Sequence, residues 1–131
     1  MLYQELTDQI IKAFYNVYNT LGYGFLEKVY ENALVHELHK LNFDVQQQQP
    51  VSVHYDGEIV GAYFADIVVN GKVLLELKSA ESIHAGHVAQ LMNYLKATEI
   101  EVGLVLNFGP KPAFKRRILT NDRKPHLKKS V

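Results

Sequence analysis

The sequence predicts an α/β protein with a mixed central sheet and helices on its faces. Three observations support this prediction: two stretches of helical periodicity at the start, three extended runs after them, and then one more helix followed by a strand. A helix that connects two strands in this way forms a strand–helix–strand crossover. The length of 131 residues fits a single domain with one core.

Two helices are predicted first, over residues 3–20 and about 25–41. In both, apolar side chains recur three and four positions apart, so that each helix has one apolar face. Gly22 and Gly24 separate the helices, and Gly24 lets the backbone turn into the second helix without a side-chain clash.

Two strands are predicted next. Residues 44–56 form an extended stretch, and Pro50 favours an edge position for it because proline has no backbone N–H to donate. An Asp-Gly turn signal leads into the second strand, over residues 58–69. The four consecutive glutamines at positions 46–49 are expected to be exposed.

The hairpin from Ala65 to Lys78 combines an apolar composition with charged residues. An Asn-Gly pair marks its turn, and its strands are rich in Val, Leu and Ile, yet they contain Asp66, Glu76 and Lys78. Charged groups on buried strands are costly unless they are paired or bind a metal ion. These three residues are therefore the first candidates for a functional site.

The register of this hairpin decides whether the charged residues meet. A two-residue loop would place Asp66 on the apolar face, away from Glu76. A three-residue loop, Val69-Asn70-Gly71, with its glycine in the left-handed position of a bulged turn, places Asp66 opposite Leu74. We adopt this register because Asp66, Glu76 and Lys78 then share one face. The other face is apolar throughout and consists of Ala65, Ile67, Val69, Val73, Leu75 and Leu77.

A helix over about residues 84–98 and a strand over residues 101–108 complete the predicted core. The strand is almost continuously apolar, which suits a central position buried on both faces. His87, Gln90 and Tyr94 lie on one stripe of the helix. A lone helical histidine is more often structural than catalytic, and we interpret His87 in that way.

The pattern Asp66…Glu76-Leu77-Lys78 resembles the signature of the PD-(D/E)xK nuclease superfamily, with Ala65 where proline is usual. This resemblance implies a restriction-endonuclease-like fold, in which an αβββαβ core forms a mixed central sheet flanked by helices. It also implies a metal-dependent nuclease, that is, a hydrolase acting on phosphodiester bonds.

A longer match is to the GxxExxY family. Its name motif is present from Gly24 to Tyr30, and the matching blocks continue to Gly109. Gln90 and Tyr94 are similar to the QxxxY motif of the RecB-like branch of the superfamily, in which the pair lines the active site and contacts the substrate.

The resemblance implies that Mg²⁺, or Mn²⁺ in its place, binds at the charged face, and carboxylate oxygens suit these hard cations. Asp66 and Glu76 are expected to bind the ion directly, Leu77 through its backbone carbonyl, and Glu27 directly or through water. Without the resemblance, Glu27 is better explained by its favourable position in the first turn of a helix. Lys78 is expected to orient the attacking water and to offset charge in the transition state.

The expected substrate is nucleic acid, with DNA favoured over RNA. Gln90 is counted with Asp66, Glu76 and Lys78 as catalytic. Two tyrosines, Tyr94 and Tyr30, are expected to help position the substrate strand. A homodimer or a larger nuclease assembly stays open, as do the strandedness of the substrate and the mode of cutting.

Charge is divided unevenly along the chain although the net charge is zero. Residues 1–110 contain 6 Lys and Arg against 13 Asp and Glu, whereas residues 111–131 contain 8 Lys and Arg against one Asp. We therefore divide the sequence into a nuclease-like domain, 1–110, and a basic, partly ordered C-terminal segment, 111–131, in which residues 113–119 form a strand or a short helix. A solvated tail explains the basic block equally well. The candidates for phosphate contacts are Lys111, Lys115, Arg116 and Arg117.

Composition excludes several other classes of protein. The chain has no cysteine, so disulfides and thiolate metal sites are excluded. No apolar run reaches the length of a membrane span and no signal peptide is recognisable, so we expect a cytoplasmic protein without a membrane partner. Three alternatives to an enzyme stay open, namely a catalytically silent nucleic-acid-binding module, a protein-interaction module on the nuclease fold and a structural salt-bridge cluster that binds no ligand. The third is the least favoured, because the carboxylates outnumber the single lysine.

Overall fold

The computed structural model describes residues 1–124 of the chain, and each predicted helix and strand is present within a few residues of its expected bounds. The stretch predicted as a strand or a short helix is a strand. None of the helices in the described part is both long and apolar enough to cross a membrane. In chain order the elements are α1 (Gln4–Leu21), α2 (Glu27–Lys40), β1 (Val45–Tyr55), β2 (Glu58–Val69), β3 (Val73–Lys78), α3 (Ala85–Ala97), β4 (Val102–Phe108), β5 (Pro112–Ile118) and the short 3₁₀ helix η1 (Asn121–Arg123).

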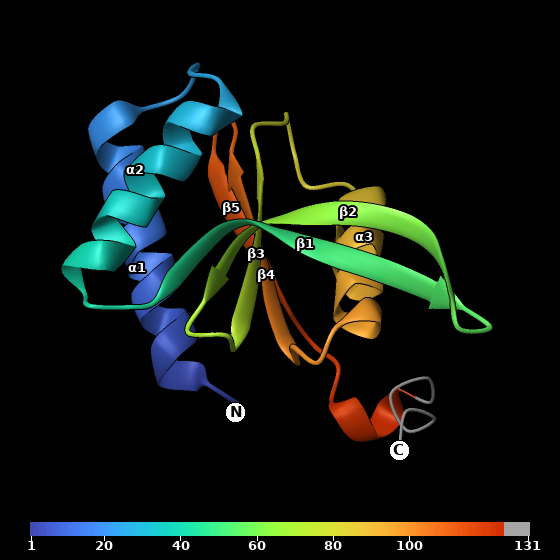
Figure 1. Cartoon of the computed structure of the whole chain (residues 1–131). Helices are drawn as coiled ribbons and strands as arrows, with labels where there is room; N and C mark the ends of the chain where they lie inside the picture. The colour runs from blue at the N-terminus through green and yellow to red at the C-terminus, as the bar shows by residue number, and fades with distance from the viewer. Residues whose placement is uncertain (125–131) are drawn as a thin grey trace.

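The five strands form one mixed sheet in the order β1-β2-β3-β4-β5. β3 and β4 are parallel and are connected through α3, and the other neighbouring pairs are antiparallel. α1 and α2 cover one face of the sheet and α3 covers the other (Figure 1). This is the α/β architecture with a mixed central sheet that the sequence predicts, with β1 at an edge and β4 buried along its whole length.

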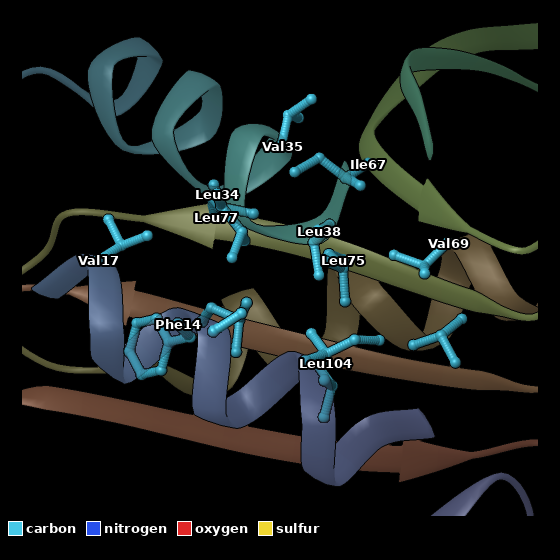
Figure 2. Packing of buried hydrophobic residues seen from close by; sticks show 14 of the residues in the cluster. Phe14, Val17, Leu34, Val35, Leu38, Ile67, Val69, Leu75, Leu77 and Leu104 are labelled. Carbon is cyan, nitrogen blue, oxygen red and sulfur yellow. The ribbon is translucent and has the colours of Figure 1, made fainter. Parts of the chain in front are cut away.

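The larger apolar core lies between the sheet and the helices α1 and α2. Side chains from both helices pack on those of β3 and β4, as Figure 2 shows for Phe14, Leu34, Leu75 and Leu104, which are all fully buried. Each such side chain contributes about 1.5–3 kcal/mol through the removal of apolar surface from water. This face supplies most of the hydrophobic stabilisation of the fold.

The core on the α3 face is smaller and leaves part of the sheet for polar residues. Leu91 and Leu95 of α3 pack on Leu74 and Val105. Gly103 permits the close approach of the helix, because a Cβ at this position would lie 2.6 Å from Leu91 Cδ1. The apolar contacts end toward the C-terminal end of β3, where the charged residues begin.

The strand β2 leaves the sheet partway along its length. It pairs with β1 along most of its length, from Glu58 to Val69, but only Ile67–Val69 pair with β3. The outer part of the β1–β2 hairpin therefore diverges from β3 and extends over α3 (Figure 1). As a result, the C-terminal half of β3 has no paired strand on that side.

The β2–β3 turn has the predicted loop length but a different position. The loop comprises Asn70, Gly71 and Lys72, so Ile67 pairs with Leu75, and the register differs by two residues from the prediction. Asn70 is held outside the ladder because its backbone N–H donates to the Asp44 carbonyl at 2.7 Å and its side-chain oxygen accepts from the Asp44 N–H at 2.8 Å. A shift of two residues preserves the alternation of faces.

One residue lies on the other face from the prediction. Ala65 belongs to the α3-side core with Val51 and Leu74, not to the α1–α2 side. The alternation of faces breaks at Asp66, where the β1–β2 pairing is interrupted opposite Gln48, a residue with a positive φ of 53°.

Candidate functional site

The side chains of Asp66, Glu76 and Lys78 come together on the α3 face. Asp66 stands where β2 leaves β3, and its Oδ2 accepts a hydrogen bond of 2.8 Å from the Leu77 N–H. This bond satisfies the backbone N–H of Leu77, which lies beyond the part of β3 that pairs with β2. Lys78 reaches toward α3, where its Nζ is 3.4 Å from Gln90 Oε1.

Glu76 is the electrostatic centre of this cluster. It is 3% exposed, and its Oε1 has no hydrogen-bond partner among residues 1–124. Burial raises the pKa of Glu76 to about 9; the negative charge of Asp66 and a hydrogen bond between the two carboxyl groups add to the rise, and Lys78 opposes it. A hard cation fits beside these two carboxylates, because it supplies a partner for the orphaned oxygen and compensates both charges.

Protein groups alone do not enclose this position. Within residues 1–124, no three His, Cys, Asp or Glu side chains gather closely enough to hold a metal ion. Two carboxylates nevertheless suit Mg²⁺, which keeps several waters and is commonly held by one or two carboxylates together with substrate phosphates. Glu27 lies at the loop after β3, where its Oε2 accepts from the Ser79 N–H at 3.2 Å, outside any such three-residue group.

α3 adds a hydrogen-bonded row next to the carboxylates. Lys78 donates to the side-chain oxygen of Gln90, and the Gln90 amide donates to the Tyr94 hydroxyl at 3.0 Å. The hydroxyl hydrogen of Tyr94 is thereby left for another acceptor. Burial raises the pKa of Tyr94, and Glu76 and Asp66 add to this rise, so the hydroxyl stays protonated at neutral pH.

His87 has the structural role that we infer from sequence. Its Nδ1 accepts a hydrogen bond of 3.1 Å from the His84 N–H and so caps the start of α3. Its pKa is lowered by desolvation first and then by the positive charges of Lys78 and His84, whereas Glu27 raises it.

Three residues that the sequence does not mark as site residues, Gln47, Gln48 and Glu31, complete the surroundings of Asp66. Gln48 Nε2 lies 3.1 Å from Glu31 Oε1 and 3.5 Å from Asp66 Oδ1, and Gln47 Nε2 donates to Glu31 Oε2 at 2.7 Å. Glu31 is only 5% exposed. Its position one helical turn after Glu27 is the signal that could have identified it, because residues four apart share a helix face.

The structure corrects the expected role of Tyr30. The side chain is fully buried, and its ring stacks on Phe108 with the ring centroids 4.4 Å apart. Its hydroxyl donates to the Gly22 carbonyl and accepts from the Phe25 N–H. Tyr30 therefore closes the loop between α1 and α2 and cannot contact a substrate.

The basic residues of β5 are divided between the two faces of the sheet. Lys115 is exposed and pairs with Val105, and Arg117 pairs with Gly103, so both lie on the α3 face. Arg116 points the other way: its guanidinium donates to Thr7 Oγ1 at 3.3 Å and to the Leu2 carbonyl. It ties the sheet to the start of α1, which corrects its expected role in phosphate contact.

The basic segment begins at Lys111 and includes β5. Lys111 is exposed in the turn before β5. β5 itself lies within the segment that the sequence separates from residues 1–110, and it is paired with β4 from Pro112 to Ile118. Residues 125–131 lie outside the described part of the chain.

Comparisons with known proteins bear on the fold and the family of this chain. A solved structure titled "Crystal structure of SSO0001" has a similar fold, with a TM-score of 0.54, 18% sequence identity and coverage of 98% of this chain. The present chain spans 65% of the length of that protein. No protein with a curated description matches the chain. A family model described as the PD-(D/E)XK nuclease superfamily matches residues 4–118, from α1 through β5. Because this match covers most of the sequence, the chain belongs to the PD-(D/E)XK nuclease superfamily.

Proposed function

We propose that this protein is a metal-dependent nuclease of the GxxExxY family and the RecB-like branch. The observation that carries the proposal is the buried pair Asp66 and Glu76, with an orphaned carboxylate oxygen, beside Lys78 at the open end of β3. Membership of the superfamily supports the same reading. The substrate is nucleic acid, with DNA favoured over RNA.

Asp66 and Glu76 would hold Mg²⁺ or Mn²⁺, with the backbone carbonyl of Leu77 as a further ligand. The bound cation supplies a Lewis acid that lowers the pKa of a water and offsets the charge on the phosphate. Because the pKa of Glu76 is about 9 without a cation, the free protein keeps this carboxyl protonated at pH 7. Cation binding must therefore release a proton.

The side chains around the carboxylates have separate roles in the proposed mechanism. Lys78 orients the attacking water and offsets negative charge as the phosphate becomes pentavalent. Gln90 holds the ammonium group of Lys78 on the carboxylate face through its side-chain oxygen. Tyr94 directs its free hydroxyl hydrogen to a phosphate oxygen of the substrate.

The test is a cleavage assay with the purified chain and labelled single- and double-stranded DNA and RNA, in Mg²⁺, Mn²⁺ or EDTA. Cleavage of at least one substrate that requires the cation and disappears in Glu76→Gln is the expected result. Glu5→Gln, at an exposed position in the first turn of α1, is the matched control and should cleave like wild type. Cleavage that continues in Glu76→Gln would assign the activity to a contaminant or to another site.

A catalytically silent module that binds nucleic acid is the second candidate. The observation in its favour is that no three metal-ligating side chains gather within residues 1–124. Calorimetry separates the two functions, because a nuclease of this design takes up Mn²⁺ and releases a proton. Binding of nucleic acid without Mn²⁺ uptake and without cleavage would favour the silent module.

A further inference from the structure

A groove of about 700 Å³ runs between the outer part of the β1–β2 hairpin and α3. Its size is in the range of pockets that take one small ligand. Gln90 and Tyr94 form part of its wall, and the same two residues extend the hydrogen-bonded row from Lys78. The groove therefore begins at the candidate catalytic residues and leads away from them.

Tyr63 of β2 offers an aromatic face in this groove. It is 49% exposed, and its ring centroid lies 5.8 Å from that of Tyr94. Gly61 leaves room for the ring, since a Cβ at this position would lie 3.1 Å from Tyr63 Cε2. A half-exposed ring that is supported by its own strand and by a second aromatic ring is a platform on which a planar group can stack.

The groove is lined by basic and neutral side chains. Lys96 of α3 and Arg123 of η1 line it, and neither makes an ion pair with another of the residues 1–124. No Asp or Glu is among the residues that line it, although residues 1–110 are acidic as a whole. Ser52 and Asn93 add groups that donate and accept hydrogen bonds. A planar aromatic group attached to a negatively charged backbone matches this combination.

We propose that the groove binds one unpaired nucleotide beside the scissile phosphate, with its base stacked on Tyr63 and its backbone phosphates directed to Lys96 and Arg123. The inference rests on the proposed function and specifies its substrate as nucleic acid with a single-stranded segment. In an uninterrupted duplex, both faces of each base are already stacked on neighbouring bases, so a base reaches Tyr63 only after it is unpaired.

The test uses the absence of tryptophan from the chain. Tyr63→Trp introduces a single fluorescent reporter in the groove, and Phe64→Trp introduces one at the next residue, an exposed position on the other face of the same strand. Both variants are titrated with a single-stranded oligonucleotide and with a duplex of the same sequence, in EDTA to prevent cleavage. We expect saturable quenching of Tyr63→Trp by the single strand, weaker quenching by the duplex, and little quenching of Phe64→Trp.

Affinity measurements on variants without tryptophan test the proposal even if the tryptophan reporter disturbs the groove. Tyr63→Ala should weaken binding of the single strand by about fivefold or more, the loss of one stacked base. Tyr63→Phe keeps the ring and should bind within about twofold of wild type. Unchanged affinity in Tyr63→Ala, or equal affinity of wild type for single strand and duplex, would overturn the proposal.

The same variants distinguish failure of this inference from failure of the proposed function. Binding that depends on Tyr63 but is not followed by cleavage with Mn²⁺ would refute the nuclease and support the nucleotide site. Cation-dependent cleavage that is equal for single strand and duplex, and unchanged in Tyr63→Ala, would support the nuclease and refute the site.

Discussion

Neighbouring residues of the same strand have different roles on the two faces of the central sheet. On β3, Leu75 and Leu77 point toward α1 and α2 and are buried in the larger apolar core, whereas Glu76 and Lys78 point toward α3. The alternation of a strand is enough to separate them, because successive side chains lie on opposite faces. Folding free energy thus comes mainly from one face, and the other can carry groups that destabilise the fold.

Glu76 illustrates this cost. A carboxylate in its position is ionised at neutral pH only if a positive charge compensates it, since its pKa without one is about 9. The apolar residues on the opposite face of β3 are insensitive to pH. A substitution on one face should therefore change stability, and a substitution on the other should change activity and its pH dependence.

The largest expected effect is a contrast between the neighbouring residues Glu76 and Leu75. Glu76→Gln should reduce cleavage by about a hundredfold to a thousandfold or more, because it removes a charged group from the transition state. It should leave the free energy of unfolding equal to or above that of wild type. Leu75→Ala should instead lower the free energy of unfolding by about 2–5 kcal/mol through a cavity in the core. Urea denaturation and cleavage assays on both variants test the contrast, which fails if Glu76→Gln is as unstable as Leu75→Ala.

A substitution of Lys78 should separate the effect on metal binding from the effect on cleavage. Lys78→Met should reduce cleavage by about a hundredfold, the scale of losing one electrostatic contact in the transition state. Mn²⁺ binding, measured by calorimetry, should be unchanged or tighter because a positive neighbour of the carboxylates is gone. Lys12→Met, at an exposed position on α1, is the control. Loss of Mn²⁺ binding in Lys78→Met would place this lysine in a structural role.

The third prediction concerns pH. Because the pKa of Glu76 in the folded protein, about 9, is above the ordinary value of 4.5, the folded protein keeps a proton that the unfolded chain releases. This stabilising contribution is complete below pH 4.5 and is lost as the pH rises toward 9. In EDTA, the free energy of unfolding should fall by up to about 1.4 kcal/mol per pH unit in this window. Glu76→Gln should remove this contribution to the slope, and a slope identical to that of wild type would contradict the assignment.

Much of the fold follows from local patterns in the sequence, and the register of the hairpin does not. The Asn-Gly turn and a loop of three residues are predictable, but the anchoring of Asn70 to Asp44 depends on a contact over 26 residues of chain. The predicted face of Asp66 is nevertheless correct, because the register differs from the prediction by an even number of residues. The predicted face of Ala65 is wrong, since the β1–β2 pairing is interrupted at Asp66 and Ala65 packs in the core on the α3 face.

The candidate site shows a similar limit. The charged residues on β2 and β3 and the pair Gln90 and Tyr94 on α3 are predictable as neighbours from alternation and helical spacing. Tyr30 is in the name motif but closes a loop in the core, because a motif does not distinguish a buried hydroxyl from an exposed one. The groove at Tyr63 is formed by elements that only the fold brings together.

The smallest expected effect compares neighbouring basic residues on the two faces of β5. Lys115 is exposed in the row that crosses the sheet from Glu76 through Val105, two strands and roughly 10 Å away. Arg116 is bonded to α1 on the opposite face. If Lys115 contacts a phosphate, Lys115→Gln should reduce the slope of log affinity against log salt concentration by about 0.7–0.9, one phosphate contact.

Arg116→Gln is the matched control for that measurement. It should leave the salt slope unchanged and lower the free energy of unfolding by about 1–3 kcal/mol, because the Leu2 carbonyl and the Thr7 hydroxyl lose a charged donor. Fluorescence anisotropy of a labelled oligonucleotide between about 50 and 200 mM salt gives both slopes. Equal slopes for Lys115→Gln and wild type would show that Lys115 does not contact a phosphate, and would favour binding in the region between β3, α3 and the β1–β2 hairpin.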